Sequence, residues 1–176
     1  MSRGSARTGP VLAYLSLGSN LGDRFENLRR AAAAVGAGPN LRLLGVSKVY
    51  RTEPVEVGPG HPEYLNCALA VECALPPVEL LRFCQGVEAA LGRDRKGELA
   101  PRTVDIDLLL YGEETVAEPD LAVPHRGIVR AFNLRCLADL DPKLEVPGRG
   151  RVEELLAVAD TSGVREFEAE TGVRGG

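Results

Sequence analysis

The chain has 176 residues, with 21 Lys and Arg against 25 Asp and Glu, so its formal net charge is −4. This length suits one compact domain, and 44% hydrophobic residues allow a sizeable core, which excludes disorder of the whole chain. The acidic balance disfavours general nucleic-acid binding but allows a local basic patch for a small phosphorylated ligand. No apolar run approaches the roughly 20 residues that span a bilayer, so we expect no membrane association. The four cysteines have no CxxC spacing, and we expect buried free thiols in a reducing cytoplasm.

The first elements predict a strand, a turn and a helix. Residues 1–10 form a small, polar segment that we expect to be a flexible leader. Residues 11–17 are apolar and predict a buried strand. A short signal peptide is the alternative, but the run ends in Gly18-Ser19-Asn20 rather than in a small-x-small cleavage site. A helix follows, with Asp23 as its N-cap, and its apolar residues recur at helical spacing: Phe25, Leu28, Ala32 and Val35.

The middle of the chain predicts two strands, a second helix and a further strand. Residues 41–52 are expected to form one long strand with an irregularity near Gly45, and residues 64–75 alternate in part. Between them, residues 54–63 form a loop by composition. Pro76-Pro77 opens a helix that ends at Gly92. After the charged loop 93–102, Val104 to Tyr111 predicts a central strand.

The C-terminal part predicts two helices, over 129–140 and 152–159, and a weakly ordered tail over 160–176. We therefore expect a single domain over 11–159. The βαββαβ order predicts an α+β fold, a ferredoxin-like sandwich with an antiparallel sheet and helices on one face. The other face must then find another cover or line a site.

Asp105 and Asp107 are the first candidates for chemistry. Strand side chains alternate, so the two carboxylates share one face while Ile106 points into the core. Mg²⁺ is typically held by one or two carboxylates plus substrate phosphates. Helix caps or salt-bridged surface acids are the alternative. The apolar run 108–110 places the pair in an interior strand, which favours a metal site.

The charged loop before this strand holds a dense set of cations: Arg93, Arg95, Lys96 and Arg102. Arginine forks bind phosphate oxygens in pairs and stabilise charge during phosphoryl transfer. A solvated loop, with Asp94 and Glu98 as partners, is the alternative. Because this set of cations precedes two carboxylates in the sequence, it favours a binding site for a polyphosphate. Neither a Walker A sequence nor GxGxxG occurs, so a P-loop or Rossmann site is unsupported.

Tyr64 and Asn66 share a face of their predicted strand. An aromatic ring beside an amide suits a flat heterocycle with an amide-like edge, although edge-strand packing is the alternative. His125 follows a proline, and a lone histidine is more often structural than functional. Gln85 and Glu88 stand three residues apart on the predicted second helix, where solvation of the helix is an equal alternative.

Several motifs occur together in order. They are Leu17-Gly18-Ser19-Asn20-Leu21-Gly22-Asp23, Tyr50-Arg51-Thr52, Tyr64-Leu65-Asn66, Gly92-Arg93, Pro101-Arg102-Thr103-Val104-Asp105-Ile106-Asp107 and Val123-Pro124-His125. From about residue 11 to 145 the chain resembles the 6-hydroxymethyl-7,8-dihydropterin pyrophosphokinases of folate biosynthesis. The resemblance implies a ferredoxin-like core and transfer of diphosphate from ATP to the pterin hydroxymethyl group, releasing AMP.

The resemblance also implies roles for individual residues. Asp105 and Asp107 match a pair that holds two Mg²⁺, and Arg93 and Arg102 match arginines that engage the ATP phosphates. Further nucleotide-side positions are matched by Gln85, Glu88, Arg95, Lys96, His125 and Arg130. The pterin pocket is matched by Thr52, Pro54, Val55, Tyr64, Asn66 and Phe132. We expect a monomer or weak dimer that acts on small molecules.

The chain departs from the family pattern at three places. Leu99-Ala100 stand where many relatives have an aromatic residue, in a basic loop that is one residue shorter. The spacing from His125 to Arg130 is also one residue shorter, which weakens the match for Arg130. Asp120 stands where a basic residue often helps to hold ATP, and we expect weaker nucleotide binding. The competing hypotheses are a non-catalytic nucleotide- or partner-binding module and a nucleotidyl transferase that releases pyrophosphate.

Overall fold

The computed structural model describes residues 9–53, 63–92 and 103–168. Its main strands are β1 (Val11–Ser19), β2 (Leu41–Val46), β3 (Tyr50–Thr52), β4 (Tyr64–Cys73), β5 (Asp105–Tyr111) and β10 (Val164–Glu166). The helices are α1 (Arg24–Gly36), α2 (Pro77–Gly92), α3 (Ala131–Leu140) and α4 (Val152–Ala157). Two small hairpins pair β6 (Val116–Glu118) with β7 (Leu121–Val123), and β8 (Glu145–Val146) with β9 (Gly150–Arg151). None of the described helices is long and apolar enough to cross a membrane.

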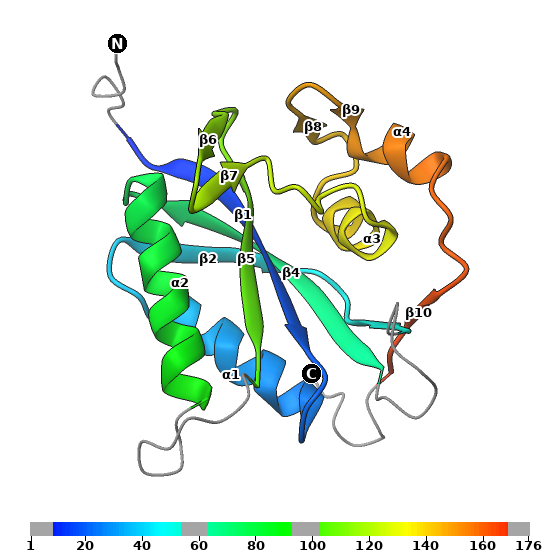
Figure 1. The fold of residues 1–176 in the computed structure, drawn as a ribbon, viewed down its shortest axis with the longest axis horizontal. Helices are drawn as coiled ribbons and strands as arrows, with labels where there is room; N and C mark the ends of the chain where they lie inside the picture. Colours follow the sequence, from blue (N-terminus) through cyan, green and yellow to red (C-terminus); the bar gives the residue numbers. More distant parts are fainter. Residues whose placement is uncertain (1–8, 54–62, 93–102, 169–176) are drawn as a thin grey trace.

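One antiparallel sheet organises the molecule (Figure 1). Its strands lie in the order β10-β3-β4-β1-β5, and β2 also pairs with β4. The central pair, β1 and β4, runs in continuous register from Val11 opposite Cys73 to Ser19 opposite Leu65. This topology confirms the predicted ferredoxin-like fold. It corrects one expectation: β5, predicted as a central strand, lies at an edge of the sheet and pairs with β1.

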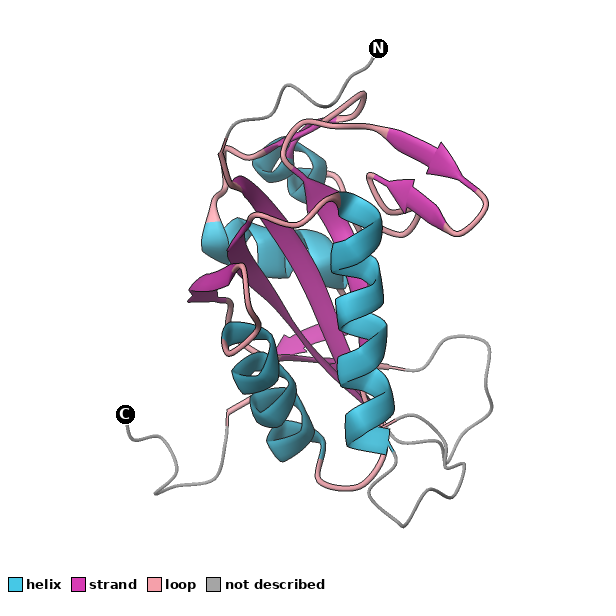
Figure 2. Ribbon diagram, turned by 90° about the vertical axis from the view of Figure 1, so that its left-hand side faces the viewer, coloured by secondary structure: helices cyan, strands magenta, loops and turns pink. Residues whose placement is uncertain are grey.

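Helices α1 and α2 cover one face of the sheet, and α3 lies against the other (Figures 1 and 2). Alternation along the strands divides the side chains between the two faces. On the first face, alternate residues of β1 such as Leu15 and Leu17 join the largest buried cluster, together with Ile106 and Leu108 of β5. On the second face, Tyr14 packs in a smaller cluster under α3 and α4. All four cysteines are buried and free, as predicted.

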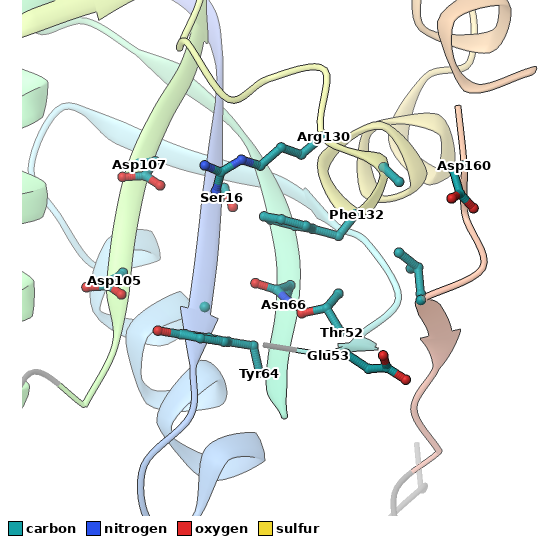
Figure 3. A pocket seen from close by; sticks show the side chains of 14 residues that line it. Ser16, Thr52, Glu53, Tyr64, Asn66, Asp105, Asp107, Arg130, Phe132 and Asp160 are labelled. Carbon is teal, nitrogen blue, oxygen red and sulfur yellow. Dashed lines mark hydrogen bonds between the residues drawn. The ribbon is translucent and has the colours of Figure 1, made fainter. Parts of the chain in front are cut away.

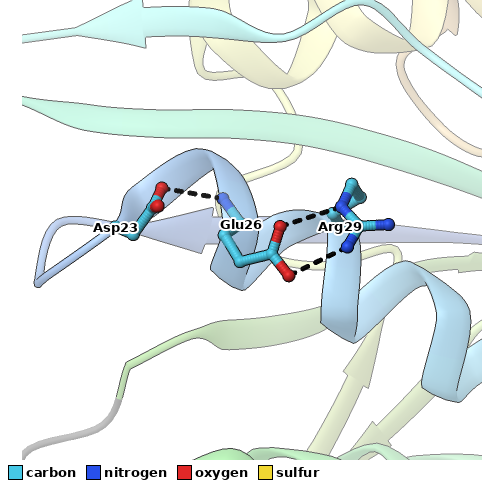
Figure 4. A network of polar contacts seen from close by, with 3 residues as sticks. All are labelled: Asp23, Glu26 and Arg29. Carbon is cyan, nitrogen blue, oxygen red and sulfur yellow. Dashed lines mark hydrogen bonds and ion pairs between the residues drawn. The ribbon is translucent and has the colours of Figure 1, made fainter. Parts of the chain in front are cut away.

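The start of α1 follows its sequence signals (Figure 4). The Asp23 carboxylate accepts a hydrogen bond from the Glu26 backbone N–H at 3.1 Å, which satisfies one of the amides without a helical partner. Arg29 donates to both Glu26 oxygens at 2.9 Å, and this hydrogen bond lowers the pKa of Glu26. Both groups are exposed, so the pair contributes little to stability.

The predicted long strand over 41–52 is interrupted, and this is a correction to the sequence analysis. A register shift between Leu43 and Gly45 is the expected irregularity, but the strand also breaks over residues 47–49. Ser47 bridges the break: its N–H donates to Ala68 O, and its Oγ accepts from Ala68 N at 2.8 Å. A buried serine side chain thus replaces one rung of the backbone ladder, which hydrophobic patterning does not reveal.

The C-terminal segment also differs from expectation. Residues 160–176 were expected to form a weakly ordered tail, yet β10 lies within them and pairs with β3, with Val164 opposite Thr52. Phe167 N–H donates to Val49 O at 2.8 Å, and the Phe167 ring lies 5.7 Å from that of Phe25. The segment is short and polar, so its order depends on an open sheet edge rather than on its own pattern. Residues 169–176 lie outside the described part.

Candidate active site

A cavity of about 770 Å³ opens on the second face of the sheet, beside α3 (Figure 3). Its lining combines carboxylates, aromatic rings, amides and one arginine. It is lined by Ser16, Gly18, Thr52, Glu53, Tyr64, Asn66, Asp105, Asp107, Arg130, Ala131, Phe132, Asp160, Gly163 and Val164. The second face of the sheet is therefore partly covered by α3 and partly open as a candidate site.

Strand register explains why polar groups meet here. Gly18 of β1 lies opposite Asn66 of β4 on one side and opposite Asp105 of β5 on the other. Ser16 lies opposite Asp107 in the next row on the same face. A Cβ at Gly18 would stand 2.8 Å from Asn66 Oδ1, so only glycine leaves this row open. Three strands far apart in sequence thus place an amide and two carboxylates on one surface.

The carboxylate pair fits a hard divalent cation. Asp105 is partly buried, the Asp107 side chain is 50% exposed, and both line the cavity from β5. Within the described ranges, no cluster of three or more His, Cys, Asp or Glu side chains could hold a metal. Two carboxylates on one wall of a cavity suit Mg²⁺, which usually completes its shell with water and substrate phosphates.

His125 lies beside this pair. Its Nε2 is 3.7 Å from Asp107 Oδ1, and its Nδ1 accepts the Gly127 N–H at 2.9 Å. Because Nδ1 is occupied as an acceptor, the neutral ring carries its hydrogen on Nε2, which faces Asp107. A Cβ at Gly127 would stand 3.3 Å from Arg130 Nε and 3.4 Å from His125 Nδ1, so these two side chains flank one glycine. Arg130 extends into the cavity toward Ser16 (Figure 3).

The middle of the cavity is flat and aromatic. Figure 3 shows the rings of Tyr64 and Phe132 with Asn66 and Thr52 between them, all lining the same space. Asn66 is 4% exposed, and its Nδ2 donates to Thr52 Oγ1 at 2.8 Å. That bond fixes the plane of the amide. The arrangement suits a planar heterocycle that stacks on aromatic rings and pairs its edge with the amide.

Polar contacts on α3 position Phe132. Near the start of the helix, Asn133 Nδ2 donates to Gly127 O at 2.8 Å. Near its end, Asp139 accepts the hydroxyl hydrogen bond of the buried Tyr50 at 2.7 Å. Burial, and secondarily the Asp139 carboxylate, raises the pKa of Tyr50, so the phenol stays protonated and keeps donating. Both ends of the helix are thus held to the loop and to the strand beside the cavity.

A second, smaller cavity of about 280 Å³ lies beyond Asp107, which lines both. It is lined by Leu81, Ile106, Asp107, Leu108, Glu118, Pro119, Asp120, Leu121, Ala122, His125 and Arg126. The space thus runs along β5, past the β6–β7 hairpin and beside α2. A ligand that occupied it could reach the carboxylate pair from the side opposite the aromatic rings.

The structure brings together most of the predicted site residues that it describes. Thr52, Tyr64, Asn66, Asp105, Asp107, Arg130 and Phe132 line the main cavity, and His125 lines the second. Gln85 is exposed on α2 and lines neither. Glu88 is 9% exposed and accepts the Ile106 N–H at 2.7 Å, which ties α2 to β5. The remaining predicted positions lie outside the described residues: Pro54, Val55, Arg93, Arg95, Lys96, Leu99, Ala100 and Arg102.

Sequence reasoning missed seven residues that line the main cavity: Ser16, Gly18, Glu53, Ala131, Asp160, Gly163 and Val164. The signal for Ser16 and Gly18 was present, because alternation puts both on the face opposite Leu15 and Leu17. The C-terminal residues had no such signal. Their approach to the cavity depends on the pairing of β10 with β3.

Comparisons with known proteins agree with this geometry. A family model described as 7,8-dihydro-6-hydroxymethylpterin-pyrophosphokinase (HPPK) matches residues 14–142. The 2-amino-4-hydroxy-6-hydroxymethyldihydropteridine pyrophosphokinase of Methylorubrum extorquens is 41% identical over 157 residues, covering 89% of this chain and 98% of the relative. The Pseudomonas aeruginosa protein of the same name is 39% identical over 156 residues, covering 88% of this chain and 95% of the relative.

Solved structures agree at the level of the fold. A Plasmodium falciparum HPPK-DHPS crystal structure matches with a TM-score of 0.68 at 16% identity. The match covers 87% of this chain and 45% of that longer chain. The sequence matches, which span most of both partners, carry the assignment: the chain belongs to the 7,8-dihydro-6-hydroxymethylpterin-pyrophosphokinase family.

Proposed function

We infer that this chain transfers diphosphate from ATP to the hydroxymethyl group of 6-hydroxymethyl-7,8-dihydropterin and releases AMP, a step in folate biosynthesis. One observation carries the inference beyond family membership. A single cavity joins an aromatic pocket with a buried amide to a pair of carboxylates on a neighbouring strand. These are the two kinds of site that a pterin alcohol and a magnesium-bound polyphosphate require.

The pterin ring lies between Tyr64 and Phe132 in this proposal. Asn66 pairs with the amide-like edge of the ring, and Thr52 holds the Asn66 amide in its plane. Pro54 and Val55, outside the described residues, complete the pocket by resemblance. The hydroxymethyl arm then points along the sheet surface toward Asp105 and Asp107, because those carboxylates line the same cavity two strands away.

ATP approaches from the second cavity. Asp107 belongs to both cavities, so phosphates placed at the carboxylate pair leave the nucleoside beside His125 and the β6–β7 hairpin. Arg130 reaches the phosphate region from α3, and Gln85 and Glu88 are assigned to the nucleotide side by resemblance. Arg93, Arg95, Lys96 and Arg102 are assigned to the phosphates in the same way.

Asp105 and Asp107 would hold two Mg²⁺. When bound, the ions neutralise phosphate charge and favour in-line displacement. The chain itself orients the reactants: stacking fixes the ring, and the hydroxyl oxygen is held in line with the β-phosphorus. The new bond joins that oxygen to the β-phosphorus, the bond to the α,β-bridging oxygen breaks, and AMP leaves. The hydroxyl proton passes to solvent through the open cavity, and no covalent enzyme intermediate is needed.

Product analysis with Mg-ATP and 6-hydroxymethyl-7,8-dihydropterin tests the proposal. We expect AMP and pterin diphosphate in equal amounts, and no product from the Asp107→Asn variant. Pyrophosphate in place of AMP would contradict diphosphate transfer and support a nucleotidyl transferase. ATP binding without AMP formation would support a non-catalytic binding module.

We further propose that the protein acts in the cytoplasm as a monomer or weak dimer. Four buried thiols without a disulfide among the described residues support a reducing compartment. Light scattering during size-exclusion chromatography measures the mass in solution, and a stable higher oligomer would contradict the second part.

A further inference from the structure

The turn that leads into β10 forms part of the wall of the main cavity. Asp160, Gly163 and Val164 all line it, although they lie beyond residue 142, where the family match ends. Figure 3 places Asp160 across the cavity from Asp105 and Asp107, with the aromatic pocket between them. The end of the cavity opposite the carboxylate pair is therefore built from the C-terminal segment. We call the three lining residues, Asp160, Gly163 and Val164, the end wall.

The end wall is anchored on both sides. Beyond it, β10 pairs with β3, and the Phe167 N–H donates to Val49 O. Within it, Val164 packs against the buried cluster of Tyr50, Ala68 and Cys136, and Val164 N–H donates to Thr161 O at 3.0 Å. Withdrawal of this segment would break the sheet edge that carries Thr52. The wall is thus a fixed boundary and not a loose tail.

The proposed function orients the substrate relative to this wall. With the hydroxymethyl arm toward Asp105 and Asp107, the opposite edge of the ring faces the other end of the cavity. Thr52, which orients Asn66, is the residue paired directly with Val164. The space left to that edge of the heterocycle therefore depends on the side chains of the end wall.

We propose that the end wall is a specificity determinant for the heterocycle: it limits how far a bicyclic ring can extend on the edge opposite the hydroxymethyl arm. The proposal rests on the proposed function, because the orientation of the ring follows from the reaction. Its residues touch neither the phosphates nor the carboxylate pair. Changes there should alter heterocycle binding and leave nucleotide binding unchanged.

Gly163 provides the sharpest test. A Cβ at Gly163 meets no atom within 4 Å, so the first atom of a side chain can be added there without a clash. Gly163→Phe should raise the dissociation constant of 6-hydroxymethylpterin about tenfold or more, measured by pterin fluorescence without nucleotide, because it fills space needed by the ring. The KM for the dihydropterin should rise in parallel, with the ATP dissociation constant unchanged.

Ser162→Phe is the matched control. Ser162 is exposed, precedes Gly163 and does not line the cavity, while its backbone N–H still donates to Asp160. We expect wild-type pterin binding in this variant. If Gly163→Phe lowers the melting temperature more than the control does, Asp160→Phe replaces it, since Asp160 is exposed and lines the same wall.

The outcomes separate this proposal from the proposed function. Equal pterin binding by the wall variants and the control would overturn the proposed role of the end wall in specificity, even if the wild type forms AMP. Wild-type pterin binding without AMP would contradict the proposed function, and weaker binding in Gly163→Phe would still support the wall. A wild type that binds no pterin would overturn both.

Discussion

The two faces of the main sheet differ in this protein: one packs into the core, and the other carries the candidate site. On the face under α1 and α2, apolar side chains from β1, β4 and β5 form the largest core cluster. On the other face, α3 and α4 cover one half over Tyr14 and Leu109, and the other half stays open and polar. The same strands supply both faces: side chains alternate along β1 and β4, and along β5 up to a register shift that places both Leu109 and Leu110 on the second face. Stability and chemistry are thus encoded in one strand, at odd and even positions.

Substitution of Asp107 should produce the largest effect on activity. Asp107→Ala removes half of the carboxylate pair, and we expect turnover to fall by a factor on the order of a thousand or more. The side chain is 50% exposed, so the melting temperature should stay close to that of the wild type. AMP release and thermal unfolding measure the two effects. Normal turnover in this variant would remove the basis for the metal site.

The adjacent residue should show the reverse pattern. Leu108 is 3% exposed and points into the core under α2, so Leu108→Ala leaves a cavity there. We expect a loss of about 2–5 kcal/mol in the free energy of unfolding. Activity per folded molecule should fall far less than in Asp107→Ala, because the side chain faces away from the carboxylates and contributes only apolar surface to the second cavity. Urea unfolding and AMP release at low temperature test the contrast with Asp107, which would fail if both variants lost activity alike.

Gly18→Ala adds one methyl group to the open face. The new Cβ would stand 2.8 Å from Asn66 Oδ1 and so must displace the amide from its bond with Thr52. We expect the KM for the pterin to rise about tenfold, with a smaller change in kcat. Gly45→Ala is the control, because its Cβ would meet only the flexible end of Leu140 at 3.4 Å. Equal KM values for the pterin in the two variants would show that a methyl group at position 18 does not displace the Asn66 amide.

The smallest expected effect concerns the second cavity. Asp120 places a negative charge on its lining, where ATP phosphates and ribose would approach. Asp120→Lys should tighten ATP binding about three- to tenfold at low salt, with less gain at high salt, because exposed charges are screened. Calorimetry at two ionic strengths measures this. Glu113→Lys, an equal charge change at an exposed position outside both cavities, is the control.

The sequence predicted most of the architecture for local reasons. The apolar runs of β1 and β5, the proline start of α2 and the Asp23 cap of α1 each follow from neighbouring residues. It also placed Asp105 and Asp107 on one face, and Tyr64 and Asn66 on one face. The break in the strand at Ser47 was not predicted, because the Ser47 side chain there accepts a hydrogen bond from the backbone of Ala68, 21 residues away.

By itself, the sequence determined which residues carry chemistry and which belong to the core, since these depend on residue type and on a period of two or 3.6. Only the tertiary structure decided which of these residues lie next to one another. The register of three antiparallel strands brings Asn66, Gly18 and Asp105 into one row. The open edge of β3 orders β10 and makes the C-terminal segment a wall of the cavity. These long-range pairings depend on the shape of the whole sheet, which no local pattern encodes.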